Sequence, residues 1–324
     1  MREIELYKYA HMVIEQCLAV KPNEEFLAVT DTFQSQNIGK TLVGAARAIG
    51  ADSMLITYPA RERSPQEPPK VVAEAMKTAD VVFSYTSTSL THTSARVNAQ
   101  KSGTRVMTAP KLTEESFIRT MQVDLDEVAK LTTQVSDRIR KANKCRITTS
   151  KGTDLQMELG NEPLVIDGIC RQPGELDLIP FGCNVIVPKE GTPNGRIVVD
   201  GSITTIGRLA SPVILIVKDG KVVDIKGGFE AEQLRNMLEE LKDENVYNCP
   251  AEWGIGTNPK AQLIGEEPTS EGERIYGWAH VSLGNNASFS GGTVKTKIHL
   301  DAIIKNPQVE LDGAVILKEK QFNL

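Results

Sequence analysis

The feature that most constrains this fold is an alternation of short apolar runs with longer helical patterns in the first part of the chain. The runs are rich in β-branched and aromatic residues and predict strands at Phe26–Thr30, Ser53–Tyr58, Val81–Tyr85 and Arg105–Thr108. Around them, apolar spacing predicts helices at Ile4–Val20, Asn37–Ile49, Pro69–Thr78, Ser89–Lys101 and Leu125–Lys141. Strands and helices in this order form right-handed βαβ units, so we expect an α/β domain with a parallel sheet.

The pattern changes near residue 143, after which short strands dominate. Asp219-Gly220 separates two β-rich runs and is typical of a tight hairpin turn, and one helix is predicted at Glu230–Leu241. A chain of 324 residues is long enough for two hydrophobic cores. We therefore predict an α/β domain at residues 1–143 and a β-rich α+β domain, metal-binding and catalytic, at residues 144–324.

Composition excludes several classes of function. The chain has 40% hydrophobic and 24% charged residues and a net charge of −5, and it shows no basic patch with interleaved aromatics, so nucleic acid is not expected as a partner. No apolar run is long enough for a transmembrane helix, and the first residues lack a secretory signal. The five scattered cysteines fit reduced thiols. These features predict a cytoplasmic protein that acts on a small molecule or a short peptide, away from membranes.

The stretch Lys295–Asp301 alternates in the way that a half-buried strand does. Ile298 and Leu300 can face a core, whereas Lys295, Lys297, His299 and Asp301 share the other side. An imidazole and a carboxylate side by side can begin a site for a divalent metal. A plain surface pair of His299 with Asp301 explains the same spacing, so further ligands are needed.

Two further candidate ligands lie upstream. His280 is on a predicted strand, Tyr276–Gly284, where it shares a face with Ser282, and Glu252 lies in an apolar, glycine-flanked segment. A carboxylate in that setting is costly to bury without a charged partner. We therefore predict that Glu252, His280, His299 and Asp301 hold a metal. Lys295 or Lys297 is predicted to stabilise an oxyanion or to hold a substrate carboxylate; solvated lysines on the strand are the alternative.

These segments carry a resemblance to a known family. In order along the chain they are Ala251-Glu252, His280–Gly284, His299–Asp301 and Leu311–Gly313, preceded by Gly195–Gly201 and Gly227–Glu232. The order is similar to that in the thermophilic aminopeptidases (aminopeptidases T and S). The segments Gly195–Gly201 and Gly227–Glu232 resemble still more their relative 2,5-dihydroxypyridine 5,6-dioxygenase. The resemblance implies an N-terminal α/β domain, a β-rich metal domain and a homodimer.

The chain departs from both relatives at single positions. A further metal-binding glutamate of the peptidases falls at Asn184, with Glu175 or Glu190 as substitutes in another register, and their tyrosine falls at Ala287. The resemblance implies that the dioxygenase has a histidine where this chain has Glu252. Glu252 thus matches the peptidases, whereas the missing ligands match the dioxygenase.

We therefore expect an enzyme and rank a metal-dependent hydrolase first, one that cleaves an amide bond with metal-activated water. Zinc, cobalt or manganese would serve that reaction. An iron(II)-dependent dioxygenase that cleaves a dihydroxypyridine-like ring is the alternative, with His280, His299 and one carboxylate as ligands. A non-catalytic protein that binds a metal or another ligand is the third reading.

Overall fold

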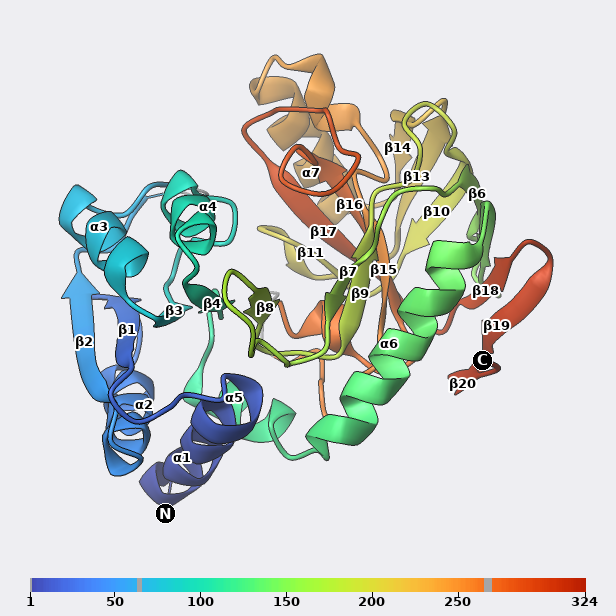
Figure 1. Cartoon of the computed structure of the whole chain (residues 1–324). Helices are drawn as coiled ribbons and strands as arrows, with labels where there is room; N and C mark the ends of the chain where they lie inside the picture. Colours follow the sequence, from blue (N-terminus) through green and yellow to red (C-terminus); the bar gives the residue numbers. More distant parts are fainter. Residues whose placement is uncertain (1, 63–65, 265–269) are drawn as a thin grey trace. The chain divides into compact units, whose positions relative to one another are not determined.

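The computed structural model describes residues 2–62, 66–264 and 270–324 (Figure 1). Contacts divide the chain into two compact units. The first unit comprises Met1–Leu125 and Asp167–Phe181, and the second comprises Asp126–Ile166 and Gly182–Leu324. Across the described residues, no helix is long and apolar enough to cross a membrane.

The first unit contains a five-stranded parallel sheet in the order β2-β1-β3-β4-β8. Its strands are β1 (Glu25–Asp31), β2 (Asp52–Tyr58), β3 (Val81–Tyr85), β4 (Arg105–Thr108) and β8 (Leu176–Leu178). Strands β3 and β4 are buried along their whole length, whereas the edge strand β2 is largely exposed or half-buried. The prediction of a parallel α/β sheet is confirmed. It succeeded because a parallel sheet covered on both faces has strands that are continuous apolar runs.

The helices of this unit are α1 (Arg2–His11), α2 (Gln36–Ala48), α3 (Lys70–Thr78), α4 (Ser94–Lys101) and α5 (Glu114–Thr120). Figure 1 shows α3 and α4 on one face of the sheet and α1 and α2 on the other. Helix α1 continues as a π-helical turn at Met12–Cys17, within the segment for which one helix is expected. Sequence reasoning missed α5 and the short strand β8, which reaches the sheet edge from a distant part of the chain.

The described part of the second unit is built from antiparallel sheets. The eight-stranded sheet runs β14-β13-β10-β6-β5-β18-β19-β20. Its strands are β5 (Lys144–Thr148), β6 (Asp154–Glu158), β10 (Asn194–Val199), β13 (Val213–Lys218), β14 (Lys221–Lys226), β18 (Gln308–Leu311), β19 (Ala314–Lys318) and β20 (Gln321–Phe322). The expected hairpin at Asp219-Gly220 joins β13 to β14.

The seven-stranded sheet runs β12-β11-β17-β16-β15-β9-β7. Its strands are β7 (Leu164–Ile166), β9 (Cys183–Ile186), β11 (Ser202–Ile203), β12 (Gly207–Arg208), β15 (Trp253–Gly256), β16 (Ala279–Gly284) and β17 (His299–Ile304). Val281, Leu283, Leu300 and Ala302 on β16 and β17 are buried in the hydrophobic core of this unit. Because side chains alternate along a strand, the intervening residues of both strands face the other way.

Helix α6 (Leu125–Lys141) packs with the second unit, as Val135 and Ile139 lie in its core. Helix α7 (Phe229–Glu240) matches the helix expected there, and short 3₁₀ turns lie at Glu244–Tyr247 and Gly272–Arg274. The contact units differ from the expected division in that α6 joins the second unit and Asp167–Phe181 the first. The domain boundary near residue 143 stays a prediction.

Two expected strands are shorter in the structure. Strand β16 begins at Ala279, and β17 begins only at His299, so Lys295 and Lys297 lie outside it. The segment before His299 is held in a loop by other contacts. Thr296 Oγ1 donates to Asp243 Oδ2 at 2.5 Å, and the carbonyl of Lys295 accepts a hydrogen bond from Asn245 Nδ2 at 3.0 Å.

Candidate metal centre

The site residues come from three neighbouring strands of the seven-stranded sheet. Glu252 directly precedes β15, His280 lies on β16, and His299 and Asp301 lie on β17. The register places Asp301 opposite Ser282 and His280 opposite Gly254. Directly opposed residues share a face, so this register brings polar side chains together on the face away from the core.

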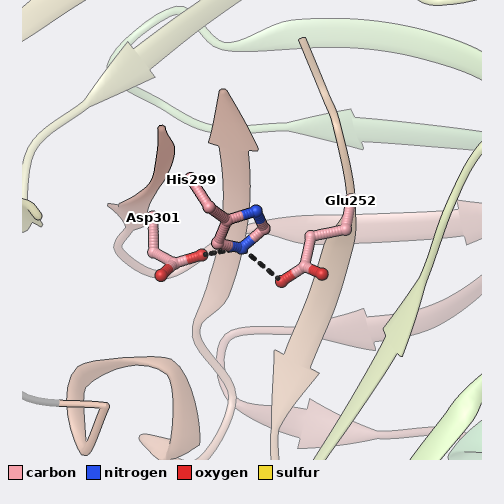
Figure 2. Close-up of side chains that lie close together, drawn as sticks. All are labelled: Glu252, His299 and Asp301. Carbon is pink, nitrogen blue, oxygen red and sulfur yellow. Dashed lines mark ion pairs between the residues drawn. The ribbon is translucent and has the colours of Figure 1, made fainter. Parts of the chain in front are cut away.

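Three of the four predicted ligands converge. His299 Nε2 lies 3.3 Å from Asp301 Oδ1 and 3.5 Å from Glu252 Oε1 (Figure 2). One ligand atom from each of the three residues lies within 4.8 Å of the others. Two ligands of one ion at about 2.1 Å each can be at most about 4.2 Å apart. The distances from His299 Nε2 to both carboxylate oxygens are within this limit.

His280 lies beside this group and outside it. Its Nε2 is 3.7 Å from Glu252 Oε1, and its side chain is fully buried. Gly254 provides the room for the ring, since a Cβ there would lie 2.6 Å from His280 Cε1. The expected four-residue set is thus present as a group of three with an adjacent imidazole.

The orientation of His299 suits metal binding. The carbonyl oxygen of Asn285 lies 2.7 Å from Nδ1, which can only donate to it, so the neutral ring has its lone pair on Nε2. That lone pair points toward two carboxylate oxygens, an arrangement that repels unless a proton or a cation lies between the atoms. Burial lowers the pKa of His299, but Asp301 and Glu252 outweigh it and hold the pKa well above its usual value.

Atoms without hydrogen-bond partners also fit a cation. Among the described residues, Glu252 Oε2, Asp301 Oδ1 and both ring nitrogens of His280 are buried and have no hydrogen-bond partner. Burial raises the pKa of Glu252, but His299 and His280 outweigh it and hold this carboxyl ionised. Burying a carboxylate with an unpaired oxygen costs free energy. Coordination of that oxygen to a metal removes the cost.

A buried ion pair borders the group. Glu273 and Arg274 lie in the 3₁₀ turn Gly272–Arg274 and pair through Oε2 and Nη1, and the Arg274 side chain is 2% exposed. Burial raises the pKa of Glu273, and Arg274 lowers it. Asp301 and Glu252 raise it further, so the pKa of Glu273 lies above its usual value. The Glu273–Arg274 pair is neutral overall. With both imidazoles neutral, as metal ligation requires, Glu252 and Asp301 leave two negative charges, which one divalent ion balances.

Two supporting groups escaped sequence reasoning. Ser282 Oγ accepts the backbone N–H of Glu252 at 2.9 Å and so holds the residue between β15 and β16. Its position on the face of His280 was readable from the alternation, but its partner was not. The Asn285 carbonyl has no signal in the sequence, because any residue supplies a backbone carbonyl.

The remaining predicted residues lie apart from the cluster. Lys295 and Lys297 are exposed in the loop before β17, and their role stays a prediction. The register places Asn184 opposite Ile255, on the face away from His280. Glu175 accepts hydrogen bonds from the backbone of Arg171 and Gln172, and Glu190 from Thr293, so within the described ranges neither joins the metal group.

Comparisons with known proteins identify relatives along nearly the whole chain. The family model NicX, described as 2,5-dihydroxypyridine 5,6-dioxygenase, matches residues 5–323. A 2,5-dihydroxypyridine 5,6-dioxygenase from Pseudomonas putida KT2440 is 27% identical over 259 residues, which cover 75% of this chain and 71% of the relative.

Two solved structures share the fold. The structure of a 2,5-dihydroxypyridine dioxygenase from Pseudomonas putida KT2440 has a TM-score of 0.87 at 21% identity and covers 99% of this chain and 97% of its own. Wild-type AmpT from Thermus thermophilus has a TM-score of 0.74 at 15% identity and covers 100% of both chains. Both resemblances read from the sequence are confirmed, although identities this low show the fold alone.

The ranking of a hydrolase above a dioxygenase is wrong. It depended on Glu252, yet imidazole and carboxylate both bind divalent metals, so one ligand cannot decide between water and oxygen chemistry. The family match instead extends over nearly every residue, and the peptidase likeness concerns the fold. The chain belongs to the NicX family, described as 2,5-dihydroxypyridine 5,6-dioxygenase.

Proposed function

We propose that this protein is an iron(II)-dependent dioxygenase that cleaves a dihydroxylated pyridine ring. The family supports the reaction class, and the convergence of Glu252, His299 and Asp301 is the structural observation that carries the proposal. The substrate class comes from the names of the family and of the 27% identical relative.

The proposed ligands are His299 Nε2, Glu252 Oε1 and Asp301 Oδ1. The histidine nitrogen lies 3.5 Å from the first oxygen and 3.3 Å from the second, within the span of one ion. We keep His280 as a fourth ligand, because its Nε2 is 3.7 Å from Glu252 Oε1, within the span that two ligands of one ion can have. Iron(II) held by a few protein ligands supplies open positions for oxygen and for the substrate. The set is richer in carboxylate than the usual two histidines and one carboxylate.

Neighbouring groups hold these ligands in place. The Asn285 carbonyl keeps the proton of His299 on Nδ1, and Ser282 anchors the backbone of Glu252. Glu252 is 3% exposed and His280 fully buried, so the electrostatic interactions within the group are little screened.

The decisive experiment compares oxygen chemistry with amide hydrolysis on the same preparation. Protein purified without chelator is loaded anaerobically with iron(II), and oxygen uptake is recorded with 2,5-dihydroxypyridine. Parallel samples with zinc, cobalt or manganese receive amino-acid amides and dipeptides. We expect oxygen uptake and loss of the ring absorbance in the wild type, and neither in His299→Ala or Asp301→Ala. Amide cleavage without oxygen uptake under any metal refutes the proposal.

A further inference from the structure

The loop that joins β16 to β17, residues 285–298, determines how His299 is held. At its start, the Asn285 carbonyl accepts the hydrogen bond from His299 Nδ1 at 2.7 Å, and the Asn285 N–H donates to the carbonyl of Ile298 at 2.8 Å. The Phe289 ring lies 5.8 Å from the His299 ring at an interplanar angle of 35°. The position of this loop therefore sets the direction in which Nε2 points.

Asn286 closes the loop on itself. Its side chain is almost fully buried, and its Oδ1 accepts the N–H of Val294 at 2.8 Å. Its own N–H donates to the Val294 carbonyl at 3.1 Å. Gly292 passes so close that a Cβ there would lie 2.1 Å from the Asn286 carbonyl oxygen. The two arms of the loop therefore meet at Asn286, directly beside the carbonyl that orients His299.

Glu190, which follows β9 in the chain, ties this meeting point to the rest of the second unit. Its Oε1 accepts the N–H of Thr293 at 2.8 Å and Asn286 Nδ2 at 3.3 Å. Its Oε2 accepts the Thr293 hydroxyl at 2.7 Å. One carboxylate thus binds both arms of the loop, and hydrogen bonds to an ionised acceptor are stronger than those to a neutral one.

We propose that Glu190 is a positioning residue for the metal centre, which acts through Asn286 and the Asn285 carbonyl to orient His299. This inference rests on the proposed function, because it takes His299 as a metal ligand. It gives Glu190 a role in the metal site without coordination, since three donors already occupy its oxygens. Direct hydrogen-bond partners of metal ligands commonly contribute about 10- to 100-fold in metal affinity. Glu190 lies one step further out, so we expect a smaller contribution from it.

The test is the affinity of the full chain for cobalt(II), measured by competition with a chromophoric chelator. We expect Glu190→Gln to weaken binding by up to about tenfold and to change the visible spectrum of the bound cobalt(II), because the loop that carries the Asn285 carbonyl is held less firmly. The matched control is Glu230→Gln. Glu230 also accepts one backbone N–H, from Ala210, and one hydroxyl, from Ser211, but it contacts a different loop. Cobalt(II) affinity and spectrum should match the wild type in this control.

A second pair of variants keeps the test independent of folding defects. Thr293→Val removes the hydroxyl that Glu190 binds and should weaken cobalt(II) binding, whereas Thr293→Ser keeps a hydroxyl and should restore it. Thermal unfolding of each variant shows whether the fold persists. Equal affinities and spectra in Glu190→Gln, Thr293→Val and the wild type overturn the inference. His299→Ala separates the two proposals, because cobalt(II) binding retained in that variant refutes the metal site itself.

Discussion

Gly254 on β15 lies directly opposite His280 on β16, and the imidazole ring occupies the space that a side chain at Gly254 would take. A Cβ at this position would lie 1.9 Å from the carbonyl oxygen of Asn184 and 2.6 Å from His280 Cε1. The first contact is with backbone and cannot be relieved by a rotamer change. The close approach of β9, β15 and the His280 ring therefore requires glycine here.

We accordingly expect Gly254→Ala to destabilise the protein by about 2 kcal/mol or more, the usual cost of overpacking, and to weaken metal binding. The measurement is the midpoint of chemical denaturation, together with metal content. Gly44→Ala is the control, because Gly44 lies inside α2 and its added Cβ would meet only the Tyr7 ring, at 3.4 Å. Alanine should stabilise the helix there by up to about 1 kcal/mol. Equal stability of Gly254→Ala and wild type contradicts the packing argument.

Loss of His299 and loss of His280 should reduce metal affinity by different amounts. His299→Ala removes a ligand at the centre of the group, and we expect metal affinity to fall by more than about 100-fold with the fold preserved, because β17 keeps its apolar face. For His280→Ala we expect a smaller loss, about tenfold, since His280 lies outside the group of three. Elemental analysis and chelator competition measure both, with His11→Ala as control, because His11 is half-buried on α1 in the first unit and pairs with Glu15. Identical losses in both variants would show that the imidazoles are equivalent ligands.

The two exposed lysines before β17 remain candidates for binding an anionic group of the substrate. A charge-assisted hydrogen bond contributes about 1.5–3 kcal/mol, so Lys295→Ala or Lys297→Ala should raise KM about tenfold or more if the lysine makes one. Steady-state kinetics with the ring substrate measure this, with kcat expected to change little. Lys318→Ala, at the exposed end of β19, is the control. An unchanged KM in both variants assigns the lysines to the solvated surface.

Stability should depend on pH through a buried carboxyl in the first unit. Burial and the neighbouring Asp167 raise the pKa of Asp177 well above its usual value. Because the folded-state pKa is raised, the contribution of Asp177 to the free energy of unfolding is fully present below the unfolded pKa of about 4. It is lost as pH rises through the folded-state pKa. The loss is at most about 1.4 kcal/mol per pH unit for one proton. Denaturation from pH 4 to 8 should show a flatter profile in Asp177→Asn than in the exposed control Asp52→Asn.

The family resemblance also predicts a homodimer. Sedimentation at micromolar concentration should give a mass twice that of the chain, and the mass should persist in His299→Ala, since the metal ligands lie within one chain. A monomer at every concentration tested would contradict this prediction.

The sequence alone determined the features that depend on local spacing. Continuous apolar runs predicted the parallel strands β1, β3 and β4, and the period of two along a strand placed His299 and Asp301 on one side. The same rule placed the start of β17 too early. An alternating pattern does not reveal the contacts of Asp243 and Asn245 that hold Thr296 and Lys295 in a loop.

Only the tertiary structure decided which distant groups meet. Strand register brought Glu252 to His299 and left His280 beside them, and loop closure placed the Asn285 carbonyl on Nδ1. Strand β8 joined the first sheet by pairing with β4, although its own three residues carry no strong strand pattern. These outcomes depend on hydrogen bonds and packing between segments far apart in the chain, whose free energies no local pattern of residues encodes.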